Sequence, residues 1–150
     1  MCLKSVGQSS QCPPNGQKTD AMHRSRVTRD PVRALRICHV IDRSIVAGLG
    51  VPAGMLSGRP IAGRPIRGGS AVAFARQVAM YLGHVGCGLT YTEAGRLYGR
   101  DRTTAAHACT VIEDHRDDPI FDRVIELLER CVRMGLCQIE PELAARLPKL

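Results

Sequence analysis

A chain of 150 residues with 44% hydrophobic content is long enough for one domain with tails and a modest core. The net charge of +7 fits a nucleic-acid partner, although basic patches also serve anionic membranes or are only solvated surface. Aromatic residues make up only 3%, which argues against a base-stacking platform for single strands.

The cysteines and the apolar runs exclude several other classes. The seven cysteines include no C-x-x-C pair and no matched histidine spacing, so no zinc site or other metal site is predicted. Lys4 and Gly7 break the first apolar run, so no signal peptide is expected, and no run approaches the roughly 18 apolar residues of a membrane span. We therefore expect a cytoplasmic protein with reduced thiols, in which Cys109 and Cys131 are small core residues.

Residues 1–30 mix Ser, Gln, Pro, Gly, Lys and Arg without a hydrophobic period, which predicts a flexible, disordered basic arm. The alternative is an arm that lies along DNA phosphates.

An accessory helix is then predicted within 31–56, with Pro31 at its first position and its end near Gly48–Gly50. Residues 51–56 are expected to add one helical turn. The predicted buried face repeats every three to four residues: Leu35, Cys38, Ile41, Ile45 and Val46.

Residues 57–69 hold too much Gly and Pro for regular structure and are interpreted as a basic linker. A Gly-Arg-Pro-Ile repeat occurs there twice, and Arg67 follows it. Extended arginine-bearing segments can enter the minor groove, so Arg59, Arg64 and Arg67 are candidate minor-groove or phosphate contacts. A flexible connector is the alternative.

The next helix is predicted over 71–82, with Ser70 as its cap. Its apolar stripe contains Phe74, Val78, Tyr81 and Leu82, widened by Val72, Ala75 and Ala79. Arg76 is either an ordinary surface arginine or a phosphate contact. Gly83, Gly86 and Gly88 predict a loop after this helix.

Residues 90–116 predict two short helices joined by a tight turn. Thr90 and Glu93 form a T-x-x-E capping box at the start of a helix that runs to about Tyr98. Gly99 allows the left-handed conformation in which many helices stop, and Asp101 can cap the next helix. The pattern indicates a helix–turn–helix.

The second of these helices has two unlike faces. At about 100° per residue, one stripe is polar: Thr103, His107, Thr110 and Asp114, with Thr104 beside it. The opposite face is small and apolar: Ala105, Ala108, Cys109 and Ile112. Such a helix is thin enough for a DNA major groove. Arg100, Arg102 and the helix dipole favour phosphate at its start, whereas Asp114 repels it, so contacts are expected in the first two turns.

Asp117 or Asp118 with Pro119 predicts the start of a last helix that runs to about Gly135 and closes the core. Its apolar stripe contains Phe121, Val124, Ile125, Leu128, Cys131 and Val132. Residues 136–150 are expected to be a tail with a short helix over 142–147. Together these elements predict an all-α fold, a small helical bundle of four or five helices in which 70–135 form the helix–turn–helix domain.

Three stretches of this sequence also occur together in a known family. They are Arg76-Gln77-Val78-Ala79-Met80-Tyr81-Leu82, then Thr90-x-x-Glu93-Ala94-Gly95, then the run from Gly99 to Cys109. In order and spacing they resemble the C-terminal DNA-binding domain of the bacterial chromosomal replication initiator DnaA, over about 70–116. The resemblance implies a bacterial, nucleoid-associated protein that reads a double-stranded element, the DnaA box.

By this resemblance, the base-reading segment is Asp101, Arg102, Thr103 and Thr104, with His107 on the same face. An Asp can accept from cytosine N4, and Thr methyls can pack on thymine methyls. The chain departs from the family at Arg102, where His is common, and at Phe74, where the initiator places an arginine before its Arg-Gln pair. The phosphate or minor-groove contacts are then Arg59, Arg64, Arg67, Arg76 and Arg100.

The sequence contains no G-x-x-x-x-G-K-[ST] phosphate loop, so no ATPase activity and no cofactor are expected. An enzyme would have to use His107 with Asp101 or Cys109, but Cys109 falls on the opposite face, so no catalytic residue is predicted. The reader could act on replication initiation or at promoters as a transcription regulator. A further alternative is a protein-interaction module that binds a partner through the 31–46 helix or the last helix. The oligomeric state stays open.

Overall fold

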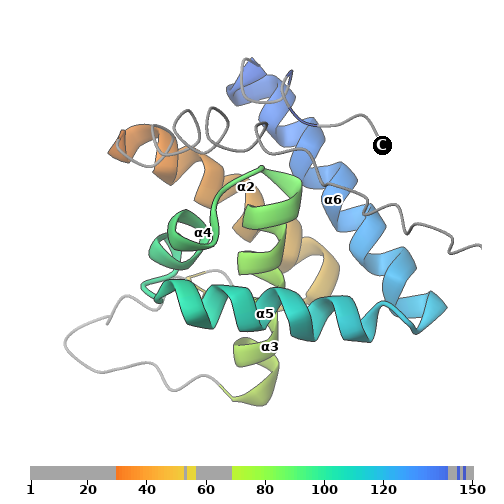
Figure 1. The fold of residues 1–150 in the computed structure, drawn as a ribbon. Coiled ribbons are helices and arrows are strands. Elements are labelled where there is room, and N and C mark those ends of the chain that lie inside the picture. Colours follow the sequence, from red (N-terminus) through yellow and green to blue (C-terminus); the bar gives the residue numbers. More distant parts are fainter. Residues whose placement is uncertain (1–29, 53, 57–68, 142–144, 146, 148–150) are drawn as a thin grey trace, which may run out of the picture.

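The computed structural model describes residues 30–52, 54–56, 69–141, 145 and 147 (Figure 1). Within these residues the chain forms five α-helices and a π-helical turn, with no β-strand, which confirms the all-α prediction. The elements are α2 (Pro31–Leu49), α3 (Ser70–Tyr81), η1 (Leu82–Gly86), α4 (Tyr91–Leu97), α5 (Arg102–His115) and α6 (Pro119–Ile139). None of the helices in this described part is long and apolar enough to cross a membrane.

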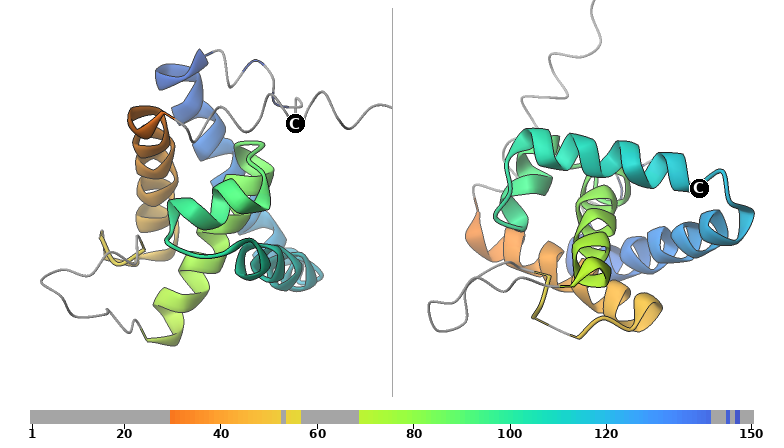
Figure 2. Two further views of the ribbon diagram at one scale, coloured as in Figure 1. Left: turned by 60° about the vertical axis from the view of Figure 1, so that its left-hand side comes forward. Right: turned by 90° about the horizontal axis from the view of Figure 1, so that it is seen from below.

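Helix α3 lies at the centre of the bundle. Helices α4 and α5 pack on one side of it, and α2 and α6 lie on the other side (Figures 1 and 2). α2 and α6 run in opposite directions and approach closely at two glycines. A Cβ atom on Gly48 would lie 2.7 Å from Leu128 Cδ2, and one on Gly135 would lie 2.6 Å from Val40 Cγ1. The absence of side chains at these positions therefore sets the spacing of the two helices.

Helix α2 has the predicted ends, and its buried face contains the predicted Ile41 and Ile45 but differs from the prediction at Leu35 and Ile37. Asp30 caps it by accepting from the Val32 amide at 2.9 Å, and Gly50 ends it with a φ of 66°. Ile37, Ile41 and Ile45 are fully buried at intervals of four residues, whereas Leu35 is 69% exposed. The prediction for Leu35 was wrong because it lies two residues from Ile37, a rotation of about 200° around the helix.

The segment after α2 is a turn. The predicted extra helical turn over 51–56 is not present in the described residues, where the Met55 amide donates to the Pro52 carbonyl at 3.4 Å. Val51 and Leu56 are buried, so the turn folds back on the core.

Helix α3 continues without a break into η1. Ser70 is the first helical residue and makes no capping bond, because Gly69 occupies the capping position. The predicted loop at 83–88 begins instead as the π-helical turn of η1. Gly83 and Gly86 are buried in this wider turn, and a Cβ atom on Gly83 would lie 3.5 Å from Ala94 Cβ of the next helix. Only Gly88, with a φ of 66°, supplies the turn that the sequence predicted.

Helix α6 begins as predicted, with Asp118 accepting from the Ile120 amide at 2.9 Å. It extends beyond the predicted end at Gly135, because this glycine serves contact with α2 instead of a helix stop. Cys131 is exposed, so its prediction as a core residue was wrong; at about 100° per residue it lies roughly 120° from Ile125. The buried stripe is Ile125, Leu128, Val132 and Leu136.

A polar network ties the central helix to α6. The Arg116 guanidinium, at the end of α5, donates from Nη1 to the Tyr81 hydroxyl at 2.6 Å and to Glu129 Oε1 at 3.0 Å. Burial is the main cause that raises the pKa of Tyr81, to about 12. The hydroxyl therefore stays protonated and donates to Glu129 Oε1 at 3.2 Å. The network fixes the C-terminal end of α5.

Candidate nucleic-acid interface

The capping box predicted at the start of α4 is present. The Thr90 hydroxyl accepts from the Glu93 amide at 3.3 Å, and Glu93 Oε2 accepts from the Thr90 amide at 2.9 Å. Glu93 is 3% exposed, so this carboxylate is part of the packed structure. The box fixes where α4 begins.

The turn between α4 and α5 folds back on Gly95. The amides of Tyr98 and Arg100 donate to the Gly95 carbonyl at 3.0 and 2.8 Å, and Gly99 has a φ of 64°, as predicted. A Cβ atom on Gly95 would lie 2.7 Å from the Asp101 carbonyl oxygen and 2.8 Å from that of Arg100. Sequence reasoning assigned no role to Gly95. Its position inside so short a helix could have indicated this role. Glycine weakens a helix, so it is expected there only where neighbouring backbone leaves no room for a Cβ atom.

Asp101 caps α5, as predicted. Its Oδ1 accepts from the Thr104 amide at 2.7 Å, and hydrogen bonds from Thr104 lower the pKa of this carboxyl below its ordinary value. The charged carboxylate lies at the positive end of the helix dipole, which favours the same charge state. Asp101 is exposed, so this cap lies on the surface where the interface is predicted.

Helix α5 has the two predicted faces. Arg102, Thr103, His107 and Thr110 are exposed, and Thr104 is half-buried. The buried side, confirmed as predicted, consists of Ala105, Ala108, Cys109 and Ile112, which pack the helix on α3 and α4. The start of the helix thus presents short polar groups to solvent on a rigid support.

Arg76 is not an ordinary surface arginine. Only 7% of it is exposed, and its Nε and Nη2 donate to the Leu56 and Met55 carbonyls at 2.9 and 3.1 Å. Burial, and then the nearby charge of Arg100, lower the pKa of Arg76. The Arg76 side chain therefore joins α3 to the turn that contains Met55 and Leu56. Its guanidinium also lies near that of Arg100, in the turn between α4 and α5.

The other predicted contacts fall into two groups. Arg100 is exposed in the turn directly before α5. Arg59, Arg64 and Arg67 lie outside the described residues, as do all but one residue of the predicted arm 1–30 and most of the tail after Gln138. The domain boundaries drawn from the sequence stay predictions.

The alternative catalytic pair is separated by the helix. Cys109 is 2% exposed, and burial raises its pKa to about 11, whereas His107 is exposed on the opposite side. No group of three or more His, Cys, Asp or Glu side chains in the described part of the chain could hold a metal ion. The geometry of α5 suits a binding surface.

This surface lies in a segment that matches known proteins. Residues 67–112 match the family model described as the bacterial DnaA protein helix-turn-helix. A curated relative, the chromosomal replication initiator protein DnaA of Lachnoclostridium phytofermentans, is 39% identical over 59 residues. That match covers 38% of this chain but only 13% of the relative. No solved structure matches.

These matches confirm the resemblance to the C-terminal domain of DnaA. The matched residues run from the segment before α3 to near the end of α5, so they contain the capping box, the turn and the exposed start of α5. The described domain is a DnaA-like helix–turn–helix, a class of DNA-binding domain. The chain spans a small part of the curated relative, so the relative's full activity does not transfer with the match.

Proposed function

Since this chain carries a DnaA-like helix–turn–helix, we propose that it binds double-stranded DNA sequence-specifically, at sites that resemble the DnaA box. α5 would enter the major groove with its first two turns. The observation that carries the proposal is the exposed polar start of α5, held by a buried apolar face on α3 and α4.

The proposed base-reading residues are those at the start of α5. They are Asp101, Arg102, Thr103, Thr104 and His107. Asp101 keeps one carboxylate oxygen on the Thr104 amide, which leaves its other oxygen for a base donor such as cytosine N4. Arg102, exposed at the first helical position, can donate to guanine or to phosphate.

The proposed phosphate contacts surround this segment. Arg76 and Arg100 lie close enough for their charges to interact, and a phosphate between them would relieve that repulsion. Arg59, Arg64 and Arg67 precede α3 in the chain and would reach the backbone or the minor groove beside it. Such contacts position the protein on DNA and carry no sequence information themselves.

We further propose a role in replication initiation or its regulation, in the bacterial nucleoid, by occupation of initiator sites. The match to a chromosomal replication initiator supports this role over the alternative of a transcription regulator with a diverged target. An interaction module with an incidental basic face is the second alternative. It predicts binding that is insensitive to salt.

The test is a titration of the full chain against a DnaA-box duplex and a scrambled duplex of equal length, each at two salt concentrations. We expect a preference for the box of at least about a hundredfold and a steep fall in affinity with salt. Equal, salt-sensitive binding to both duplexes would favour the transcription regulator. Absence of binding to either would contradict the proposal.

A further inference from the structure

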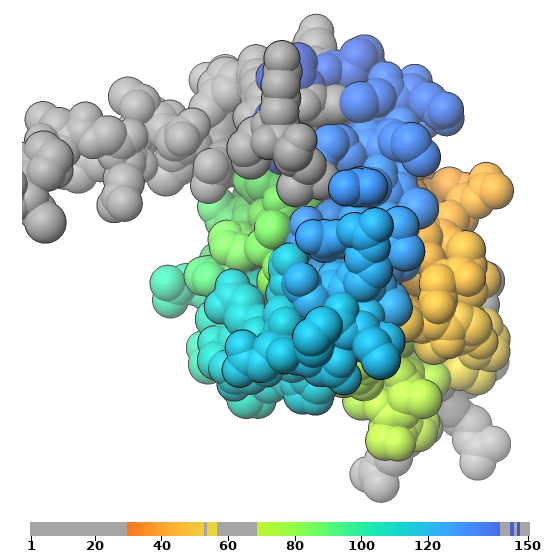
Figure 3. Space-filling view, turned by 90° about the vertical axis from the view of Figure 1, so that its right-hand side faces the viewer, coloured from red at the N-terminus to blue at the C-terminus, as the bar shows by residue number. Residues whose placement is uncertain are grey.

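A groove runs between α2 and α6. Two adjoining hollows of about 940 and 470 Å³ share Arg43, Ser44 and Cys131, and together they form what we call the α2–α6 groove. Along α6 it reaches from Val124 to Ile139 at the end of the helix. Figure 3 shows α6 (blue) and α2 (orange to yellow) next to each other, with α5 (teal) towards the opposite side.

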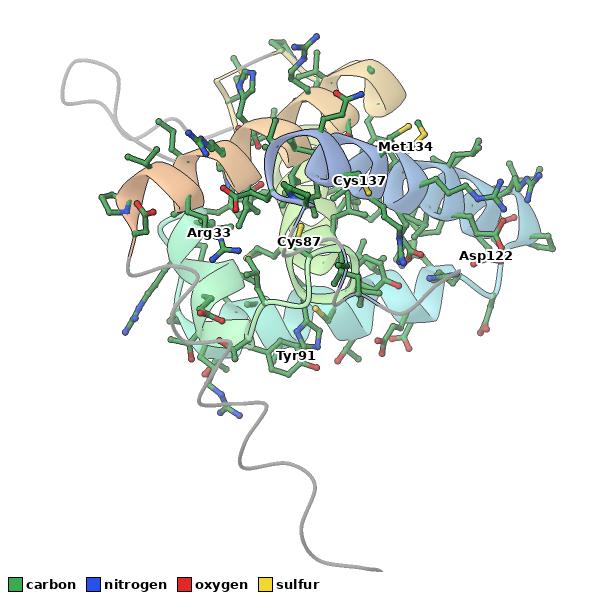
Figure 4. The ribbon with its side chains drawn as sticks, turned by 90° about the horizontal axis from the view of Figure 1, so that it is seen from above. Arg33, Cys87, Tyr91, Asp122, Met134 and Cys137 are labelled. Atoms are coloured by element: carbon green, nitrogen blue, oxygen red, sulfur yellow. The ribbon has the colours of Figure 1, made fainter. Side chains whose placement is uncertain are left out.

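The groove is bordered by exposed apolar side chains. Leu35 on α2 is 69% exposed, and Leu127 and Ile139 on α6 are 50% and 37% exposed. Met134, which is 63% exposed, also projects from α6 on the side away from α5 but lies outside the groove lining (Figure 4). A single exposed leucine needs no explanation, but several around one hollow are typical of a protein-interaction site.

The charged residues that line the groove are basic. Arg36, Arg43 and His39 belong to its lining, which contains no Asp or Glu among the described residues. Arg36 also pairs with Glu140 at 3.4 Å, whereas no described residue forms an ion pair or hydrogen bond with Arg43. An occupant with both an apolar face and carboxylates would complement this lining.

Charge argues against three other occupants. A second copy of the chain would bring its own arginines to the groove. Residues 1–29 carry Lys4, Lys18, Arg24, Arg26 and Arg29 against the single acid Asp20, so they share the charge of the groove. DNA would use the arginines but would gain nothing from the leucines, and protein–DNA interfaces are more polar than this one.

The length of the groove suggests the shape of the partner. From Val124 to Ile139, α6 rises about 22 Å, which is the length of roughly four turns of a second helix. Helices commonly dock in such grooves through an apolar face spaced at i, i+3, i+4 and i+7.

We propose that the α2–α6 groove binds an acidic amphipathic helix of a partner protein. The apolar face of that helix contacts Leu35 and Leu127, and Asp or Glu residues at its sides meet Arg36 and Arg43. α5 lies on the other side of α3, so a partner in the groove would leave the exposed face of α5 uncovered (Figure 2). The inference concerns a different face from the proposed function and does not depend on it.

The probe is a synthetic 14-residue helical peptide with a leucine stripe flanked by glutamates and a fluorophore at one end. Fluorescence anisotropy with the full chain is expected to show saturable binding. The same peptide with lysines in place of the glutamates is expected to bind at least tenfold more weakly. Amide chemical-shift changes are expected on α2 and α6 and not on α5.

Three variants test the location of the site. Leu127→Ser and Arg43→Glu are expected to weaken binding of the acidic peptide at least tenfold; both side chains are exposed, so the fold should be kept. Ile120→Ser is the matched control, because Ile120 is 78% exposed on the same helix and lies outside the groove lining. It should bind like the unmodified chain, and circular dichroism checks the fold of all three.

Several results would overturn the inference. Equal binding of the lysine peptide would show that charge plays no part, and an equal loss in Ile120→Ser would place the site elsewhere. Displacement of the peptide by a short scrambled duplex would make the groove a DNA surface. Sedimentation that shows a dimer unable to bind the peptide would assign the groove to a second copy.

Discussion

At the scale of single residues, the start of α5 combines capping with recognition. Asp101 holds the first turn through the Thr104 amide, while Arg102 and Thr103 extend into solvent beside it. A base-reading side chain needs a fixed backbone beneath it, because its hydrogen bonds discriminate only when their geometry is fixed. The cap therefore supports the residues that we propose to read DNA.

Thr103→Ala should reduce discrimination between sites. The substitution removes a methyl and a hydroxyl from the exposed face, and a base contact of this kind gives about 1–3 kcal/mol of discrimination. Thr110→Ala is the control, because Thr110 is exposed on the same stripe two turns later. The ratio of the affinities for the box and scrambled duplexes is measured for both variants. Equal loss for both duplexes in Thr103→Ala would mean that Thr103 does not read bases.

Arg64→Ala should weaken binding to all sequences alike and lower the salt slope by about one, because we propose that Arg64 contacts the backbone or the minor groove. Titrations of the box and scrambled duplexes at several salt concentrations measure both the affinity and its salt slope. Loss confined to the box duplex would instead give Arg64 a sequence-reading role.

Arg76→Met separates two roles of one side chain. Two hydrogen bonds from a charged, 7% exposed guanidinium to the Met55 and Leu56 carbonyls should make the substitution cost about 1.5–3 kcal/mol of unfolding free energy. Urea unfolding measures this loss. If Arg76 also holds a phosphate, the salt slope of DNA binding falls by about one. An unchanged slope with lost stability would leave only the structural role.

Asp101→Asn should keep the cap and change its response to pH. Asn caps helices about as well as Asp, so stability near neutral pH should change little. Because the folded-state pKa of Asp101 is lowered, its charge stabilises the fold above the ordinary Asp pKa of about 3.9, and this contribution is lost as the pH falls through the lower folded value. The asparagine variant has no such loss, because its amide does not titrate. Melting temperatures measured from pH 7 to pH 2 should therefore fall less in the variant than in the unmodified chain. An equal fall in both proteins would contradict this prediction.

At the scale of elements, the sequence was sufficient to predict helix starts and ends that are fixed by a side chain or glycine at the end of the same helix. The capping box at Thr90, the cap at Asp101, the stop at Gly99 and the helix start at Asp118 all occur as predicted. These bonds join residues two to three apart, so the sequence contains both partners. The close approach at Gly135 was not predictable, because its partner Val40 lies on another helix.

Gly95→Ala should destabilise the helix–turn–helix. An alanine favours a helix by about 0.5–1 kcal/mol, but its Cβ would lie 2.7 and 2.8 Å from two backbone oxygens, which cannot move without opening the turn. The clash should exceed the gain, for a net loss of about 1–3 kcal/mol. Gly83→Ala is the control, because its nearest neighbour, Ala94 Cβ, would be at 3.5 Å. Thermal unfolding compares the two, and equal stability would mean that the turn is not packed on Gly95.

At the scale of the whole molecule, one core contains residues from α2 through α6. The sequence predicted the fold class and the elements, because periodicity reports which helices have an apolar face. On α2 it predicted the buried Ile41 and Ile45 but included Leu35 in place of Ile37, because the two residues are equally apolar and the packing against α6 and α3 buries only Ile37. The buried Arg76 and the exposed Cys131 were missed for the same reason: their neighbours come from distant parts of the chain.

Helix α2 is therefore expected to unfold together with the DNA-reading helix. Ile41 is fully buried, so Ile41→Ala should cost about 2–5 kcal/mol, whereas Leu35→Ala on the exposed face should change stability by only about 0.5 kcal/mol. Hydrogen exchange should show that Ile41→Ala lowers the protection of α5 amides as much as that of α2 amides, because both share one cooperative core. Loss of protection in α2 alone would make it a separate module. In that case a partner in the α2–α6 groove would stabilise α2 without stabilising α5. With a shared core, binding of the partner stabilises α5, the DNA-reading helix, as well.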